Sequence, residues 1–233
     1  MGVSFKDKEF GEISVRRSMR AKRYSLKVVN GQIIATLPVG GNIDGMKEVI
    51  IRNREWIRKA LLKSPEKPLF DEQTDLQTAT VKIKIVRKSC VNYQIVTKSA
   101  KELEIVCPLD TDFHSETIQE FLKEVIVGIL RREAKRYLPP RLMLFAEKYG
   151  FEVNEVKINR SKTHWGSCTS MKNINLSLNN MLLPWHLIDY ILLHELCHTR
   201  EMNHGDRFWS LMNKVTDGKA LALREELKKY HML

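Results

Sequence analysis

Residues 185–204, WHLIDYILLHELCHTREMNH, contain the side chains best suited to chemistry in this chain. His194 and His198 are four residues apart, so a helix places them one turn apart on the same face. Two imidazoles in that arrangement can bind one tetrahedral Zn²⁺ ion. Glu195 lies beside this face, where it can take a proton from a zinc-bound water whose pKa the metal lowers to about 7. The pattern predicts a zinc hydrolase.

An HExxH pattern also arises by chance, as two surface histidines on an ordinary helix. Here the preceding turns are apolar at helical spacing, which places the motif on a core helix. Pro184 suits the start of that helix, because its missing N–H costs nothing there. A third histidine, His204, follows within reach of the same metal. These features favour a metal site.

The third ligand requires a change of chain direction. A helix that continued to His204 would carry this residue about 9 Å beyond His198 and onto another face. We therefore expect the helix to end near 201–203, where Asn203 and Gly205 tolerate the backbone conformation that ends helices. The spacing favours His204 as the third ligand. The alternatives are the carboxylates of Glu201, Glu225 and Glu226.

The sequence around this motif resembles the YgjP-like metallopeptidase family, which is related to SprT-like and Wss1-like proteases. The matching segments are RSKTHWGSCT at 160–169, NINLSL at 173–178, Pro184, IDY at 188–190, HELCH at 194–198, Asn203-His204 and Phe208-Trp209. The resemblance implies zinc ligation by His194, His198 and His204, with Glu195 as the base. The family has an arginine before WGSC where this chain has His164, so the role of His164, toward metal or substrate, is open.

The resemblance also implies a strand beside the metal helix that binds extended peptide through main-chain hydrogen bonds. Residues 173–178 are the candidate for this edge strand, with Asn175 as a substrate-binding residue. His164 is suited to binding phosphate or an oxyanion. Trp165 is expected either to stack on substrate or to pack in the core.

Carboxylates often orient ligand histidines by accepting the second ring N–H. Asp189 and Asp206 are candidates for this role, and the alternative for Asp189 is a charge that favours the helix dipole. The four cysteines form no CxxC pair, so we expect reduced thiols. Cys197 is expected in the core, and Cys168 is expected to be a structural thiol.

Composition and charge set the broad class. The chain has 233 residues, 43% hydrophobic and 29% charged, which is typical of a globular protein. It contains no apolar run of about 18 residues and no apolar segment near its first residue, so we expect a cytoplasmic protein without a membrane span. The formal net charge is +11, and residues 1–70 carry 15 Lys and Arg against 7 Asp and Glu. The basic cluster at 16–23 suits the phosphates of nucleic acid or nucleotides, or is a solvated strand edge.

The first half is predicted to consist of strands with one helix, at 44–63. Asn30-Gly31 is the expected hairpin turn, and 64–68 is a loop or linker. The segment 32–38 resembles 102–108, which suggests two strand–strand–Pro–helix units that pack into one mixed layer. The expected strands are 12–17, 23–29, 31–37, 80–86, 91–97 and 102–107.

The second half is predicted to be a small α+β core of the zincin type, with the HExxH helix beside a short sheet. Pro139-Pro140 should separate a helix at 115–136 from one at 141–149. The other expected elements are strands at 153–159 and 173–178, a loop at 160–172, and helices at 206–216 and 219–231. We expect a basic, strand-rich part at 1–112 and a catalytic part at 113–233.

The leading hypothesis is a zinc metallopeptidase that cleaves peptides or unfolded protein by Glu195-assisted attack of water. One alternative is a nucleoside triphosphate pyrophosphatase on the same metal site, an activity attributed within the YgjP-like family. Against it, the chain lacks a glycine-rich phosphate loop. Another alternative is a DNA-associated protease or binding module that uses the basic first half.

Overall fold

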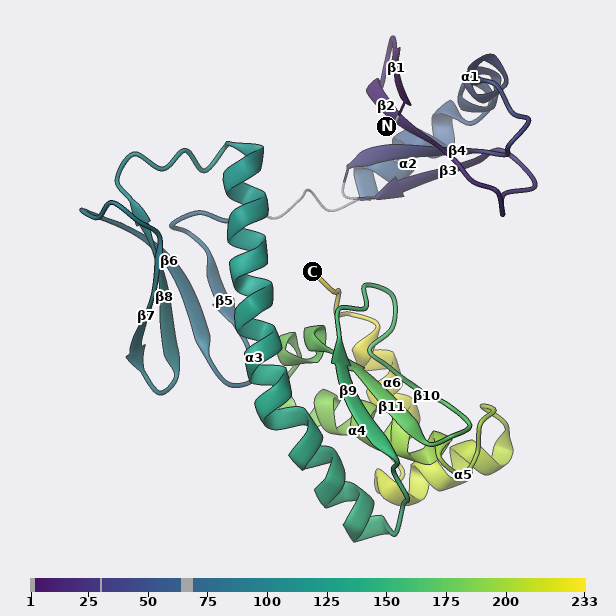
Figure 1. Ribbon diagram of the computed structural model, residues 1–233. Helices are drawn as coiled ribbons and strands as arrows, with labels where there is room; N and C mark the ends of the chain where they lie inside the picture. The colour runs from purple at the N-terminus through teal and green to yellow at the C-terminus, as the bar shows by residue number, and fades with distance from the viewer. Residues whose placement is uncertain (1–2, 30, 64–68) are drawn as a thin grey trace. The chain divides into compact units, whose positions relative to one another are not determined.

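The computed structural model describes residues 3–29, 31–63 and 69–233. It divides into two compact units, Met1–Pro68 and Leu69–Leu233 (Figure 1). The fold class is α+β, as predicted. The expected boundary at 112/113 falls inside the second unit, between a sheet and a long helix. Asn30 of the expected hairpin turn and the expected linker at 64–68 lie outside the described residues.

The first unit is a four-stranded sheet followed by two helices. Its sheet has the order β1-β2-β4-β3, in which β2 and β4 are parallel and the outer pairs are antiparallel. Alternate residues of β2 and β4 are buried against apolar residues of both helices, including Met46 and Ile57. The elements are β1 (Val3–Asp7), β2 (Gly11–Arg17), β3 (Ser25–Val29), β4 (Gln32–Leu37), α1 (Ile43–Arg52) and α2 (Arg54–Lys63).

The single helix predicted at 44–63 is wrong, because Asn53 divides it into α1 and α2. The side-chain amide of Asn53 donates to the Val49 carbonyl at 2.7 Å, and its backbone N–H donates to the Ile50 carbonyl at 3.0 Å. An asparagine side chain that satisfies these terminal carbonyls competes with continuation of the helix.

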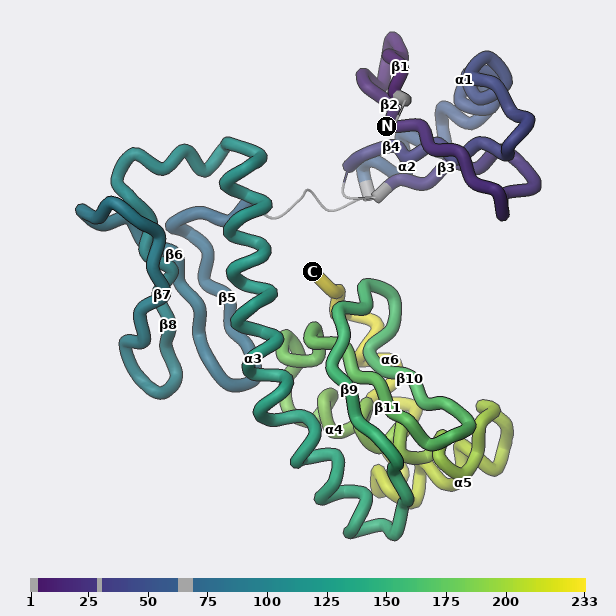
Figure 2. The backbone as a smooth tube through the Cα atoms, in the orientation of Figure 1, coloured from purple at the N-terminus to yellow at the C-terminus, as the bar shows by residue number. Residues whose placement is uncertain are grey.

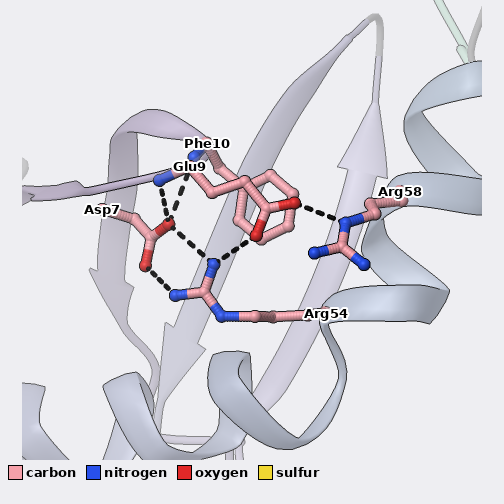
Figure 3. A network of polar contacts seen from close by, with 5 residues as sticks. All are labelled: Asp7, Glu9, Phe10, Arg54 and Arg58. Atoms are coloured by element: carbon pink, nitrogen blue, oxygen red, sulfur yellow. Dashed lines mark hydrogen bonds and ion pairs between the residues drawn. The ribbon is translucent and has the colours of Figure 1, made fainter.

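A polar network connects the β1–β2 turn to α2 (Figure 3). Arg54 binds Asp7 at 2.9 Å and Glu9 at 2.5 Å, and Arg58 also binds Glu9. The Oδ1 atom of Asp7 accepts the backbone N–H groups of Glu9 and Phe10, at 2.9 and 3.1 Å. Arg54 therefore ties the turn to the helix.

The basic segment 16–23 covers the end of β2 and the loop after it. Arg16 donates to the Thr36 hydroxyl at 3.1 Å, and Arg17 donates to the Val39 and Gly41 carbonyls at 3.0 and 2.7 Å. The cations at 20, 22 and 23 are exposed. Part of the cluster thus holds the unit together, and a nucleic-acid partner for the rest stays a prediction.

The second unit begins with another four-stranded sheet, in the order β5-β6-β8-β7. Its strands are β5 (Asp75–Gln77), β6 (Lys82–Lys88), β7 (Gln94–Ser99) and β8 (Glu102–Pro108). β6 and β8 are parallel, whereas the outer pairs are antiparallel. This arrangement matches the first sheet strand for strand.

The internal repeat predicted from 32–38 and 102–108 is confirmed, since these segments are the equivalent strands β4 and β8. A side-chain contact repeats as well. Arg17 donates to the Gly41 carbonyl and Arg87 to the Thr111 carbonyl, each across a separation of 24 residues. The expected single mixed layer is wrong, because the repeats form separate sheets, each with its own strand order.

The helix α3 (Glu116–Tyr149) runs for 34 residues between the sheet β5–β8 and the remainder of the second unit (Figures 1 and 2). The predicted interruption at Pro139-Pro140 is wrong, because both prolines lie inside this helix. Leu138 and Leu142, on either side of them, are fully buried in the core. Burial of this face offsets the backbone hydrogen bonds that the prolines remove.

The rest of the second unit carries the HELCH segment. Its elements are β9 (Glu155–Asn159), β10 (Gly166–Cys168), β11 (Asn173–Ser177), the 3₁₀ helix η1 (Leu178–Leu182), α4 (Trp185–His198), α5 (Asp206–Val215) and α6 (Ala220–Leu227). The sheet order is β10-β11-β9. β10 is a short strand within the loop expected at 160–172.

The assignment of 173–178 as an edge strand is wrong. β11 is the central strand, antiparallel to β10 and parallel to β9, so both of its edges are already paired. β10 is the edge strand that contacts α4. Across residues 3–29, 31–63 and 69–233, no helix combines the length and apolar character needed to cross a bilayer.

Candidate metal centre

The HELCH segment lies on α4, a helix that is packed against the core on most of its sides. Ten of the residues of α4 are buried, including Leu187, Leu192 and Leu196, which are fully inaccessible. Pro184 immediately precedes the helix, as predicted, with an extended backbone. Because α4 is held in this way, the positions of its histidines follow from packing as well as from helix geometry.

α4 ends at His198, earlier than the 201–203 expected from the sequence. The Thr199 hydroxyl donates to the Leu196 carbonyl at 2.7 Å, and the N–H groups of Arg200 and Glu201 both donate to the Cys197 carbonyl. These bonds satisfy the last carbonyls of the helix and let the chain leave it. The segment 199–205 then brings His204 back toward α4.

The three histidines meet at their Nε2 atoms. The His194–His198 distance is 3.2 Å, the His198–His204 distance is 3.1 Å and the His194–His204 distance is 3.0 Å. The Nδ1 atom of His198 lies 3.0 Å from the Glu201 carbonyl. We assign the ring proton of His198 to this Nδ1, which leaves the Nε2 lone pair directed at the other histidines. Three nitrogens that face one another this closely fit a shared cation.

Phe208 supports all three rings from beneath. It is fully buried, and its ring centroid lies 4.9, 4.5 and 4.7 Å from those of His194, His198 and His204. Trp209 stacks on His204, with the ring centroids 6.1 Å apart and an interplanar angle of 28°. Phe208 and Trp209 therefore both pack against the ring of His204.

The surroundings keep two of the rings neutral. Burial, together with the charges of His198, His204 and Arg224, lowers the pKa of His194 to about 3. Burial also lowers the pKa of His198. Only a neutral imidazole has the lone pair that binds a metal, so these shifts favour ligation near neutral pH.

Glu195 is buried next to the cluster, with 5% of its surface exposed. Burial raises the pKa of its carboxyl to about 8. In the part of the chain that the structure describes, its Oε2 atom and the Nδ1 atom of His194 have no hydrogen-bond partner. A carboxyl with a pKa near neutrality and a free oxygen is suited to proton transfer.

Gly166 in β10 packs directly against Glu195. A Cβ atom at this position would lie 2.6 Å from Oε1, 2.7 Å from Cγ and 2.8 Å from Cδ of Glu195. Any residue other than glycine would therefore displace the carboxyl. Sequence reasoning missed this role, although a glycine in a strand is a known sign of close approach.

The cluster opens into a cavity of about 460 Å³. One wall is the segment 163–166, and another is α4, from which Tyr190 and Ile191 join His194 and Glu195. The third wall consists of Trp209, Arg224 and Leu227. Burial raises the pKa of Tyr190 to about 12, so its hydroxyl stays protonated and can donate a hydrogen bond. The sequence offered no signal for Arg224, which lies far from the motif in a closing helix.

The predicted substrate-binding residues occupy different places. His164 lines both the main cavity and a smaller one of about 90 Å³, and its Nδ1 lies 2.7 Å from the Thr163 hydroxyl. Trp165 is half-buried, packs on the core and lines the main cavity. Asn175 lines the smaller cavity and is not among the residues that line the main one.

The expected orienting carboxylate, Asp189, pairs instead with Arg141. Asp206 is exposed in the first turn of α5. Glu201 contributes its backbone carbonyl to His198. The alternative ligands Glu225 and Glu226 have other partners: Lys228 at 2.6 Å and His186 at 2.8 Å. Of the alternative third ligands, Glu225 and Glu226 thus bind other residues. Glu201 contacts the cluster through its backbone carbonyl.

The four cysteines are free thiols, as expected. Cys197 is fully buried, and burial raises its pKa to about 12. Cys168 is half-buried, and burial together with the nearby charge of Glu195 raises its pKa to about 11. Both thiols therefore stay protonated near neutral pH and are poor nucleophiles.

Residues 22–230 match the family described as YgjP-like, metallopeptidase domain. Among solved structures, the metallopeptidase zymogen abylysin of Pyrococcus abyssi is similar at 23% identity and a TM-score of 0.36, covering 41% of this chain and 99% of that one. A comparison with curated proteins finds no significant match. Because the family match spans most of the sequence, the chain belongs to the YgjP-like metallopeptidase family, as the resemblance predicted.

Proposed function

We propose that this metallopeptidase is a zinc enzyme that cleaves peptide bonds, with Zn²⁺ held by the Nε2 atoms of His194, His198 and His204. The observation that carries the proposal is the convergence of these three atoms, at 3.0 to 3.2 Å, beside the buried carboxyl of Glu195. Because the chain belongs to a metallopeptidase family, we expect it to bind a metal ion and to act on peptides.

The donor set favours zinc in a catalytic arrangement. Three imidazoles are typical ligands of catalytic zinc, which keeps its fourth position for water or substrate. His194 and His204 border a cavity of about 460 Å³ that can admit substrate. A structural zinc site would need a fourth Cys or His, and the cluster found in the described residues contains only these three. This supports a reactive site over the alternative of a binding module with structural zinc.

When bound, Zn²⁺ supplies a water with a pKa near 7 and polarises the substrate carbonyl. Glu195 accepts a proton at Oε2, the atom without a partner in the described residues, and passes it to the leaving amine. Gly166 leaves the space in which the carboxyl stands. Phe208 packs against all three imidazole rings and fixes their positions.

The proposal is tested by comparing zinc-loaded wild type with Glu195→Gln on an unfolded protein such as denatured casein and, separately, on a mixture of nucleoside triphosphates. We expect peptide fragments from the wild type, none from the variant, and equal zinc content in both. Fragments from Glu195→Gln would contradict the assigned base. Release of pyrophosphate without fragments would instead assign the site to nucleotide hydrolysis.

A further inference from the structure

Arg224 is a cation in the wall of the active-site cavity that the proposed chemistry does not use. It comes from α6, whereas the histidines come from α4 and the segment after it. It lines the same cavity as His194, Glu195 and His204. Its guanidinium group is thus available to whatever occupies that cavity.

The Arg224 guanidinium packs on the Trp209 ring, which itself packs on His204 of the histidine cluster. Its carbon lies 5.2 Å from the Trp209 ring centroid, and Trp209 in turn stacks on His204 at 6.1 Å. Stacking on an indole uses the face of a guanidinium and leaves its N–H groups free at the edge. Trp209 therefore positions Arg224 and connects it physically to a proposed metal ligand.

The neighbouring carboxylates form their direct contacts with other residues. Glu225 binds Lys228 at 2.6 and 2.8 Å, and Glu226 binds His186 at 2.8 Å. Among the residues that the structure describes, Arg224 takes part in none of the ion pairs. An arginine fork without an internal acceptor, in a substrate cavity, is suited to bind an anion from outside.

We propose that Arg224 binds a carboxylate of the substrate, so that the enzyme favours peptides with a carboxylate close to the scissile bond. This rests on the proposed peptidase function. Two parallel N–H···O bonds from one guanidinium match the geometry of a carboxylate. Leu227, three residues later on the same helix, lines the cavity beside Arg224 and offers an apolar contact to the adjoining side chain.

The carboxylate has two possible sources, the free C-terminus of a peptide or an acidic side chain. The test uses one set of synthetic octapeptides in three forms: with a free C-terminus, with a C-terminal amide, and with a C-terminal amide plus internal glutamates. Cleavage by wild type, Arg224→Gln and Arg224→Lys is followed by mass spectrometry. Lys229→Gln, a charge removal at an exposed position just beyond α6 and outside the cavity, is the matched control.

We expect the wild type to prefer one carboxylate-bearing form over the neutral amide by about 10- to 100-fold in kcat/KM, as for charge-assisted hydrogen bonds. Arg224→Gln should lose that preference, mainly through a higher KM. Arg224→Lys should keep part of it, and Lys229→Gln all of it. The preferred form identifies the source: a free terminus indicates a carboxypeptidase, and internal glutamate indicates an endopeptidase for acidic sequences.

Equal cleavage of all three forms by the wild type, with Glu195-dependent turnover, would overturn the role of Arg224 but leave the peptidase intact. Loss of nucleotide hydrolysis alone in Arg224→Gln would also overturn it, because the anion would be a phosphate. Absence of any Glu195-dependent cleavage would instead mark failure of the proposed function.

Discussion

Gly166 and Glu195 are in contact across the β10–α4 interface, and the contact leaves no room for a methyl group. A Cβ on Gly166 would lie 2.6 Å from Oε1 of Glu195. The atoms it would meet belong to the side chain of Glu195, which can shift without movement of the backbone. The expected consequence of filling this space is therefore a displaced base in an otherwise intact fold.

Gly166→Ala should lower kcat by about 100-fold or more, because displacement of a reacting group by an ångström has an effect of that size. Zinc content and melting temperature should stay near wild-type values. The measurement is kcat on denatured casein, with zinc determined by atomic absorption. Gly128→Ala is the matched control, since a Cβ there meets nothing within 4 Å. Full activity in Gly166→Ala would show that the position of the Glu195 carboxyl does not require a glycine at 166.

His204→Ala tests the third ligand. We expect zinc affinity to fall by more than the roughly 10- to 100-fold that follows loss of a group outside the ligand set. Glu225→Ala and Glu226→Ala should bind zinc as the wild type does, because those carboxylates pair with Lys228 and His186. Competition with a chromogenic chelator measures all four affinities. Unchanged binding in His204→Ala, with a loss in Glu226→Ala, would make the ligand a carboxylate.

The histidine motif was predictable because helix periodicity alone places His194 and His198 on one face. The return of His204 followed from the same geometry, since a continued helix would have carried it away. The point at which α4 ends was less predictable. It depends on the Thr199 hydroxyl and on two N–H groups that share the Cys197 carbonyl, and such local bonds leave little trace in residue types.

Features set by tertiary contacts were missed. Pro139 and Pro140 indicate a break by their own chemistry, yet the buried face of α3 keeps the helix continuous. The central position of β11 depends on β10, a strand too short to show a period. Arg224 reaches the cavity only because α6 folds back beside α4. By contrast, the repeat was visible, since its strands carry the same apolar pattern before Pro38 and Pro108.

Phe208→Ala should destabilise the second unit and loosen the metal cluster together. The ring is fully buried and contacts all three histidines, so its removal leaves a cavity beneath them. The expected loss in free energy of unfolding is about 3–5 kcal/mol for the metal-free protein. Urea unfolding, with and without zinc, measures it. Phe208→Leu, which retains much of the volume, should lose less, and equal losses in both variants would contradict a packing role.

The Asp7–Arg54 contact predicts a pH dependence in the first unit. Burial raises the pKa of Asp7, but the N–H groups of Glu9 and Phe10 and the Arg54 guanidinium outweigh this effect and hold that pKa below its ordinary value of 3.8. A carboxyl whose folded pKa is lowered stabilises the fold above its unfolded pKa, and this contribution is lost as pH falls through the folded pKa. The network should therefore persist at pH 5 and weaken below pH 3.8.

The amide resonances of Glu9 and Phe10 report this titration directly, because both N–H groups donate to Asp7 (Figure 3). In the wild type their chemical shifts should move with a midpoint below 3.8, the ordinary value for Asp7. Arg54→Met removes the guanidinium and should raise that midpoint. Arg52→Met, which removes an exposed cation that pairs with Glu48, should leave it in place. A midpoint that is the same in Arg54→Met and wild type would show that the backbone N–H groups alone hold the pKa of Asp7 down.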